Sequence, residues 1–175
     1  MGTLTEAREA ARQVTDALVR VAYRGAYSLA MAYWFVRRPS AEGVLVGVWH
    51  GRRVLLLQNS YKRFFSMPGG GAHPGESHVQ TALRELREEV GLTWSASQLR
   101  PAFDVVDLGE FKRDHVFFME RDVDAEPALT IDRREVVWAG FIDVDSALQL
   151  PLTPTVRAYL TDAARRRASP TSQDC

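Results

Sequence analysis

Hydrophobic and polar positions follow different periods in different segments of this chain. Residues 5–36 combine alanine, leucine and arginine in a pattern that favours a long helix, which Pro39 would end. Residues 43–49 and 54–58 are runs rich in valine and leucine on either side of His50-Gly51, a dipeptide typical of a turn. The two runs therefore predict a β-hairpin.

The middle and the end of the chain predict further elements of both kinds. We expect a loop at 61–66, irregular structure at 68–75 because that segment holds four glycines and two prolines, and a helix at 77–90 closed by Gly91. Further strands are expected at 102–108, 115–121 and 136–142, and a last helix at 152–167. Strands mixed with a few helices predict an α/β or α+β sandwich around one sheet.

Composition narrows the class of protein. The chain has 175 residues, 46% hydrophobic and 25% charged, which suits one domain with a modest extension. Basic and acidic side chains each number 22, so no overall positive field argues for a specific nucleic-acid polymer as partner. The single Cys175 excludes an internal disulfide. The polar start MGTLTEAREAARQ is unlike a secretory signal, so we expect a cytoplasmic protein, with a disordered tail at 169–175.

Three carboxylates on the helix expected at 77–90 are the main candidates for chemistry. Glu85, Glu88 and Glu89 are spaced i, i+3 and i+4, so they share one helix face. Carboxylates this close raise one another's proton affinity unless a cation neutralises them, and Mg²⁺ or Mn²⁺ prefers oxygen ligands. Mg²⁺ also takes oxygens from phosphate groups, which indicates a phosphorylated substrate. The alternative is a solvated surface helix whose glutamates alternate with arginines.

A glycine-rich turn lies just ahead of this helix. Gly69, Gly70 and Gly71 would let the backbone come very close to a metal or ligand, because they have no side chain. A carbonyl oxygen of such a turn can complete the coordination of a metal. The turn and the carboxylates together therefore predict one site.

The stretch from Gly70 to Leu92 resembles the signature of the Nudix hydrolase family. That signature runs glycine, five residues, glutamate, seven residues, Arg-Glu-apolar, one residue, Glu-Glu, one residue, glycine-apolar. The chain matches it at Gly70, Glu76, Arg84-Glu85-Leu86, Glu88-Glu89 and Gly91-Leu92. The resemblance implies a Nudix-like α/β/α sandwich with a mixed sheet over about residues 40–165 and an N-terminal helical extension.

The resemblance also implies an activity, the hydrolysis of a nucleoside diphosphate linked to another group, with Mg²⁺ or Mn²⁺ as cofactor. Glu85, Glu88 and Glu89 would bind the metal, with the Gly69 carbonyl as a further ligand. Arg84 would pair with a carboxylate and hold its rotamer. Supporting roles would fall to Gly70, Glu76 and Gly91.

The resemblance leaves the general base open, because members of the family take it from different places. Glu135 is our first candidate, since it precedes Val136-Val137-Trp138 and many members carry a glutamate ahead of such a strand. Glu85 is the second candidate. Alternatively, Glu135 is an ordinary charge on an edge strand.

Side chains just ahead of the glycine turn could bind substrate. Lys62 or Arg63 could hold phosphate, and Phe65 could stack on a base. Alternatively, Phe65 packs in the core while the cations face water. The substrate stays open among nucleoside triphosphates, ADP-ribose, dinucleoside polyphosphates and nucleotide sugars.

The N-terminal segment has no counterpart in the motif. Residues 25–36 carry no charge, so a helix there needs to bury its apolar surface, yet it is too short to span a bilayer. Packing on the catalytic domain, a homodimer contact and a peripheral membrane contact through residues 17–38 are the alternatives. We divide the chain into a helix at 1–38, a Nudix domain at 39–168 and the tail.

Two functions are compatible with the motif. A metal-dependent diphosphate hydrolase uses every matched residue. The alternative is a catalytically silent nucleotide-binding sensor with the same fold, which would bind nucleotides without turning them over.

Overall fold

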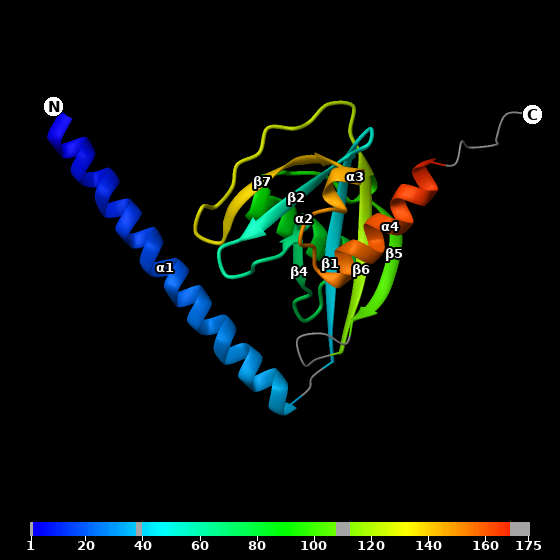
Figure 1. The fold of residues 1–175 in the computed structure, drawn as a ribbon, viewed down its shortest axis with the longest axis horizontal. Helices are drawn as coiled ribbons and strands as arrows, with labels where there is room; N and C mark the ends of the chain where they lie inside the picture. Colours follow the sequence, from blue (N-terminus) through cyan, green and yellow to red (C-terminus); the bar gives the residue numbers. More distant parts are fainter. Residues whose placement is uncertain (1, 38–39, 108–112, 169–175) are drawn as a thin grey trace, which may run out of the picture.

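The computed structural model describes residues 2–37, 40–107 and 113–168, so the expected tail at 169–175 lies outside the described residues. A long helix, α1 (Gly2–Arg37), precedes a domain in which strands and helices are mixed (Figure 1). The strands are β1 (Ser40–His50), β2 (Arg53–Asn59), β3 (Phe65–Ser66), β4 (Gly69–Gly71), β5 (Arg100–Asp107), β6 (Arg113–Asp122) and β7 (Val136–Asp143). The helices of the domain are α2 (His78–Val90), the 3₁₀ turn η1 (Ala96–Gln98), α3 (Val144–Ala147) and α4 (Pro154–Ala168).

One mixed sheet holds all seven strands. Its main path runs β3-β2-β1-β6-β5, with β4 paired to β1 and β7 paired to β2. Strands β1 and β6 are parallel over their whole shared length, from the pair Ser40 and Arg113 to the pair Trp49 and Asp122. The other pairings are antiparallel.

The predicted hairpin is present, but its two strands diverge close to the turn. Strands β1 and β2 pair only at two positions beside the turn, Trp49 with Val54 and His50 with Arg53. Farther along β1, residues 43–45 pair instead with the glycines of β4. The sheet therefore divides between β2 and β1, and β4 takes the edge of β1 that β2 leaves.

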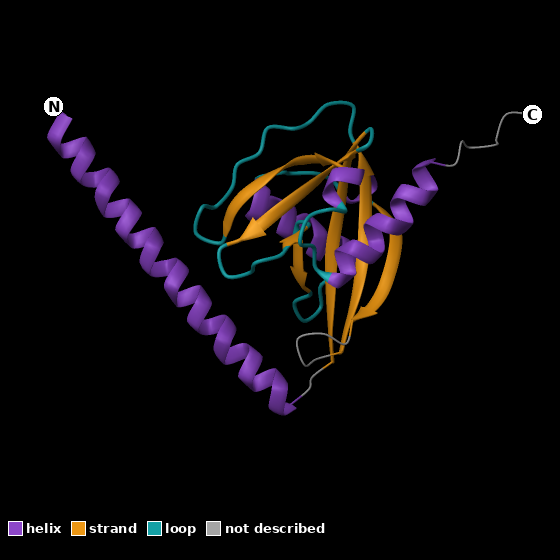
Figure 2. Ribbon diagram, in the orientation of Figure 1, coloured by secondary structure: helices purple, strands orange, loops and turns teal. Residues whose placement is uncertain are grey.

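Helices cover both faces of the sheet (Figure 2). Alternate residues of β1 and β2 point to opposite sides, so Val44, Val46, Leu55 and Leu57 meet one core while Trp49, Val54 and Leu56 meet the other. Helix α2 covers the first core with Ala82, Leu86 and Val90. Helix α4 covers the second with Val156, Tyr159, Leu160 and Ala163. The predicted α/β/α sandwich with a mixed sheet is confirmed.

A charged network lies within the second core. Glu120 of β6 is fully buried, and its carboxylate accepts a hydrogen bond of 2.7 Å from the Tyr159 hydroxyl and one of 2.8 Å from Arg166. The Tyr159 hydroxyl in turn accepts from Trp49 Nε1 at 2.7 Å. Burial alone would raise the pKa of Glu120, but the bonds from Arg166 and Tyr159 and the charge of Arg167 bring it below its ordinary value. The polar groups of Trp49, Tyr159 and Glu120 are therefore linked in one chain of hydrogen bonds.

Most sequence predictions of elements are confirmed, with two exceptions. The segment 68–75, predicted to be irregular, contains strand β4, and the loop predicted at 61–66 contains strand β3. The three glycines form a strand by pairing with β1, and the first of them must be glycine because a Cβ on Gly69 would lie 2.0 Å from the Val44 carbonyl oxygen. The short helices η1 and α3 were not predicted.

Helix α1 lies beside the domain and contacts it mainly through polar and aromatic side chains. Arg134 bonds Asp16 of α1 at 3.1 Å, and Tyr61 stacks against Tyr23 with ring centroids 6.0 Å apart. Large apolar side chains of α1 remain exposed, among them Leu18 and Leu29, the latter 74% exposed. Of the three alternatives for this segment, packing on the domain is observed in part. Among the described residues, no helix combines the length and apolar character needed to cross a membrane.

Candidate active site

The sequence around α2 fixes both ends of that helix. Ser77 caps its start in a reciprocal pair with Gln80, in which each side chain accepts a hydrogen bond from the other residue's backbone N–H. Gly91 closes it in the left-handed conformation, with φ of 72°. A Cβ on Gly91 would also lie 2.9 Å from Thr130 Cβ, so the loop before β7 packs directly on this cap. Glycine at position 91 thus ends α2 and leaves room for Thr130, while its supporting role in the site stays a prediction.

Arg84 joins α2 to the loop that precedes it. Its guanidinium donates to Glu76 through Nε at 2.9 Å and through Nη2 at 3.0 Å, and Nη2 also reaches the Gly71 carbonyl at 3.0 Å. Its Nη1 donates to Glu85 at 2.7 Å. The hydrogen bonds from Arg84 lower the pKa of Glu76 to about 2, so this carboxylate is ionised at neutral pH. One arginine thus holds the loop, β4 and a candidate metal ligand together.

Glu89 is the most buried of the three motif carboxylates, with 7% of its surface exposed. Its Oε2 accepts a 2.8 Å hydrogen bond from the backbone N–H of Gly69. Burial raises the pKa of Glu89 to about 8, a shift that the Gly69 and Asn59 hydrogen bonds only partly oppose and that the charges of Glu85 and Glu135 increase. The contact that Gly69 makes here is through its N–H, whereas the sequence predicted its carbonyl as a metal ligand.

Gly70 forms a cradle for Glu85. A Cβ at position 70 would lie 2.4 Å from Glu85 Oε1, so only glycine lets this carboxylate rest against β4. Burial raises the pKa of Glu85 against the opposing effect of Arg84, and the charges of Glu88 and Glu135 add to the rise. Glu85 and Glu89 are therefore two carboxylates that the fold holds close together at an energetic cost.

Glu88 differs from its neighbours in its exposure. Its side chain is 52% exposed and lies near arginines, 3.5 Å from Arg84 Nη1 and 3.4 Å from Arg87 Nη2. Within residues 2–37, 40–107 and 113–168, no three acidic, histidine or cysteine side chains converge as a ready ligand set. Glu85 and Glu89 nevertheless fit a hard cation, because a positive charge between them would offset the repulsion and burial that raise both pKa values.

Glu135 lies in the same electrostatic environment, although it precedes β7 and is distant in sequence. Its charge raises the pKa of both Glu85 and Glu89, and its Oε1 accepts a 2.9 Å hydrogen bond from the Tyr61 hydroxyl. Its backbone carbonyl accepts from Ser60 N–H at 2.7 Å. The structure therefore brings the first candidate for general base to the motif carboxylates.

Sequence reasoning missed Asn59 and Tyr61 as parts of this site. Asn59 is buried and bonds Glu89, and burial together with Glu135 raises the pKa of Tyr61 above its ordinary value. The available signal in the sequence was Asn59, a polar residue at the end of an apolar run, with Tyr61 two positions later. Neither residue belongs to the motif, so spacing alone could not identify them.

The residues predicted to bind substrate separate into two groups. Lys62 and Arg63 line a cleft of about 700 Å³ between α1 and the loop after β2. Phe65 instead packs against the second core and meets Trp138 edge to face, with ring centroids 5.6 Å apart. For Phe65, the structure therefore agrees with the core-packing alternative, and Phe64 is the exposed member of the pair.

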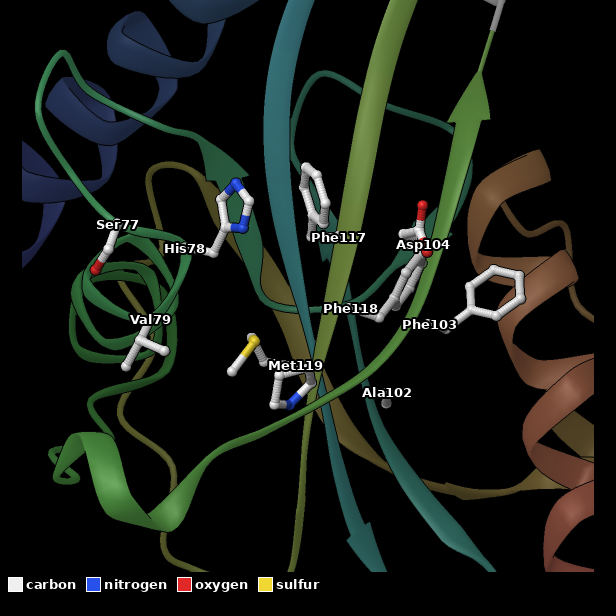
Figure 3. A pocket seen from close by; sticks show the side chains of 10 residues that line it. Ser77, His78, Val79, Ala102, Phe103, Asp104, Phe117, Phe118 and Met119 are labelled. Carbon is white, nitrogen blue, oxygen red and sulfur yellow. The ribbon is translucent and has the colours of Figure 1, made fainter.

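A second cleft, of about 540 Å³, lies at the start of α2 against strands β5 and β6 (Figure 3). His78 stacks on Phe117 with ring centroids 3.8 Å apart, and His115 lies on the same ring at 4.1 Å. Each histidine also contacts a carboxylate, Glu42 at 3.2 Å and Asp104 at 2.7 Å. The rings form an aromatic surface beside the helix that carries the motif.

The family model of the NUDIX domain matches residues 38–164. The chain belongs to the Nudix family. The matched range includes β1 to β7, α2 and most of α4, and it begins just after the end of α1.

Two kinds of hydrolase are similar to this chain in sequence. An RNA pyrophosphohydrolase of Brucella ovis is 41% identical over 63 residues, which is 34% of this chain and 35% of the relative, so the chain spans about a third of that protein's length. The asymmetrical bis(5'-nucleosyl)-tetraphosphatase of Sus scrofa is 34% identical over 116 residues, 62% of this chain and 76% of the relative.

A solved Nudix-fold structure supports the architecture. The solution structure of the E. coli ORF135 protein superposes with a TM-score of 0.63 at 20% sequence identity. The superposition covers 77% of this chain and 96% of the other. The shared fold is that of the domain, and the N-terminal helix extends beyond it.

Proposed function

We propose that this Nudix protein is a divalent-metal-dependent pyrophosphohydrolase that cleaves a diphosphate linkage in a nucleotide substrate. The observation that carries the proposal is the pair Glu85 and Glu89, held against the glycines of β4 with both pKa values raised. Such a pair is costly in a protein that binds no cation and favourable in one that does.

Each residue of the site has a distinct part in the proposal. Glu85, Glu89 and, after a change of rotamer, Glu88 would hold Mg²⁺ or Mn²⁺, with the Gly69 carbonyl as a further ligand. A bound divalent cation supplies charge neutralisation of the phosphoryl oxygens and lowers the pKa of water. Arg84 keeps Glu85 in place, and Glu76 in turn fixes Arg84.

Glu135 is the better candidate for the base that takes the proton from the attacking water. Glu85 is already engaged, because Arg84 holds its carboxylate at 2.7 Å and the proposal makes it a metal ligand. The Glu135 carboxylate accepts a hydrogen bond from the neutral hydroxyl of Tyr61. The Tyr61 hydrogen bond would also orient the Glu135 carboxylate during proton transfer.

The relatives suggest a substrate class. One relative is named as a pyrophosphohydrolase of RNA and the other as a hydrolase of bis(5'-nucleosyl) tetraphosphate, and we propose a nucleoside 5'-polyphosphate group as the substrate of this chain. We also propose that residues 39–168 form the catalytic domain and that 1–38 form a separate arm, which the family match over 38–164 supports.

A substrate panel tests the proposed function. Purified protein with Mg²⁺ or Mn²⁺ would be given diadenosine tetraphosphate, 5'-triphosphorylated RNA, deoxynucleoside triphosphates and ADP-ribose, with products resolved by chromatography. We expect turnover of at least one 5'-polyphosphate substrate, abolished by EDTA and reduced about 100-fold or more by Glu89→Gln. The matched control Glu9→Gln on α1 should be fully active. Nucleotide binding without turnover across the panel would favour the sensor instead.

A further inference from the structure

The cleft between α1 and the loop after β2 has an unusual lining. Two of its residues, Arg20 and Arg24, come from the middle of α1, and most of the others come from the end of β2 and its loop. Figure 1 shows α1 passing beside this part of the domain. Nine residues line the cleft in all, and Lys62 and Arg63 are the cationic ones that come from the domain. Four of these nine side chains are cationic and none is acidic, so the cleft suits an anion.

Backbone contacts hold the arginines of α1 at the cleft. Arg24 Nε donates to the Ser60 carbonyl at 3.2 Å, and Arg20 donates to the Arg133 carbonyl through Nε at 3.1 Å and Nη2 at 2.8 Å. These acceptors are neutral, so the positive charges of both guanidinium groups are not cancelled by them. The Ser60 hydroxyl oxygen is also buried, without a hydrogen-bond partner in the described part of the chain.

The same loop connects the cleft to the carboxylates. Asn59 lines the cleft and bonds Glu89, while Tyr61 lines the cleft and donates to Glu135 at 2.9 Å. Tyr61 also lies between the two elements, since Tyr23 and Tyr27 of α1 contact its ring at centroid distances of 6.0 and 5.4 Å. The cationic cleft therefore adjoins the candidate active site directly.

We propose that α1 completes the substrate site, with Arg20 and Arg24 binding the part of the phosphate chain that extends beyond the cleaved diphosphate. Lys62 and Arg63 bind the same part from the domain side. The ligand class is a nucleotide with three or more linked phosphates, because the diphosphate to be cleaved occupies Glu85 and Glu89 and a further phosphate is needed to meet the cations of the cleft. This inference rests on the proposed function for the position of the diphosphate.

Substrates that differ in the number of linked phosphates distinguish this proposal from a general effect on activity. In the full chain, Arg20→Ala/Arg24→Ala should raise KM for diadenosine tetraphosphate roughly 10- to 100-fold, the range expected for losing charge-assisted phosphate contacts. With ADP-ribose, which has two phosphates, the same variant should change kcat/KM less than about threefold. The matched control Arg8→Ala/Arg12→Ala removes two exposed arginines of the same helix outside the cleft and should leave both substrates unaffected.

A second variant tests whether Arg20 and Arg24 act only by docking α1. Asp16→Asn removes the ion pair with Arg134 but no cleft cation, and it should leave KM for the tetraphosphate within about threefold. Circular dichroism would establish that all variants are folded. An unchanged KM in Arg20→Ala/Arg24→Ala, or the same rise in Asp16→Asn, would overturn the proposal while leaving the hydrolase function standing.

If the wild-type protein turns over no substrate, a binding measurement still tests the cationic cleft separately from the hydrolase function. Inorganic tripolyphosphate would then be titrated calorimetrically into the full chain without metal. Binding that weakens at least tenfold in Arg20→Ala/Arg24→Ala and is retained in Arg8→Ala/Arg12→Ala would support the cleft on its own. Equal binding by all three proteins, or none by the wild type, would reject it.

Discussion

Arg84 and Glu76 form a two-point ion pair, with Nε–Oε1 at 2.9 Å and Nη2–Oε2 at 3.0 Å. Glu76 stands in the loop ahead of α2 and Arg84 two turns into it, so the pair fixes the loop on the helix. Because the other side of the same guanidinium bonds Glu85, the orientation of a candidate metal ligand depends on a residue that does not itself touch metal.

Arg84→Lys tests this dependence. An ammonium group keeps the charge but cannot bond Glu76, Glu85 and the Gly71 carbonyl together. We expect kcat to fall roughly 10- to 100-fold with the fold intact, measured as steady-state kinetics and thermal unfolding. Arg87→Lys, on the exposed side of α2, is the matched control. Equal activities of the two variants would contradict the role assigned to Arg84.

Gly70→Ala tests the cradle of Glu85. The added Cβ would lie 2.4 Å from Glu85 Oε1 and displace that carboxylate, so activity should fall at least tenfold, whereas the neighbouring change Gly71→Ala places its Cβ 4.0 Å from the Glu42 carbonyl and should be almost neutral. Metal affinity and kcat/KM would be compared for both. If Gly70→Ala binds Mn²⁺ as tightly as the wild type, the close approach of β4 has no functional part.

Glu89→Gln should stabilise the metal-free protein at high pH. Burial raises the pKa of Glu89 to about 8, well above that of an unfolded glutamate, so the native state is favoured at low pH and loses stability as pH rises through 8. An amide in its place carries no charge and still accepts from Gly69. At pH 9 the variant should gain about 1–3 kcal/mol in free energy of unfolding, measured with denaturant. The gain should shrink towards pH 6.

Metal affinity should rise with pH for the same reason. A cation requires the charged carboxylate, so below the pKa of about 8 each binding event must release a proton from Glu89. We expect the Mn²⁺ affinity to increase by about tenfold per pH unit from 6 to 8 and then level off. Calorimetry in buffers of different ionisation enthalpy would count the protons. A flat profile in the wild type would argue against Glu89 as a ligand.

Glu120→Ala should cost much more stability than a typical surface change. Removal of this fully buried carboxylate leaves Arg166 and the Tyr159 hydroxyl without their partner, so we expect a loss of about 3–5 kcal/mol by chemical denaturation. Because the pKa of Glu120 is lowered in the native state, the carboxylate stabilises the fold above its unfolded pKa and this contribution disappears as pH falls. Asp162→Ala, which removes an exposed partner of Arg166, should cost less than about 1 kcal/mol.

The elements that sequence predicted well are those whose signals are local. Helix α2 carries its own cap at Ser77 and its own stop at Gly91, and the three glutamates follow from helical spacing. The ion pair expected for Arg84 is likewise set by residues within one motif. Each of these features depends on neighbours within a few positions of the chain.

The features that sequence missed depend on distant residues. The strand formed by Gly69, Gly70 and Gly71 depends on pairing with residues 43–45 of β1, and no local preference favours glycine in a strand. Arg20 reaches Arg133 across 113 positions, and no periodicity in α1 indicates that contact. Apolar side chains of α1 are exposed in the single chain, where polar and aromatic contacts hold this helix, and a homodimer or membrane contact stays a prediction.

Helix α1 contributes no described residue to either hydrophobic core of the domain. The segment that would choose the length of the phosphate chain is thus separate from the segment that must fold correctly for hydrolysis. If α1 has the proposed role, substitutions in this helix would change substrate specificity while leaving both hydrophobic cores of the domain intact. Replacing α1 with a different N-terminal helix would then alter the substrate specificity of the enzyme without changing its catalytic residues.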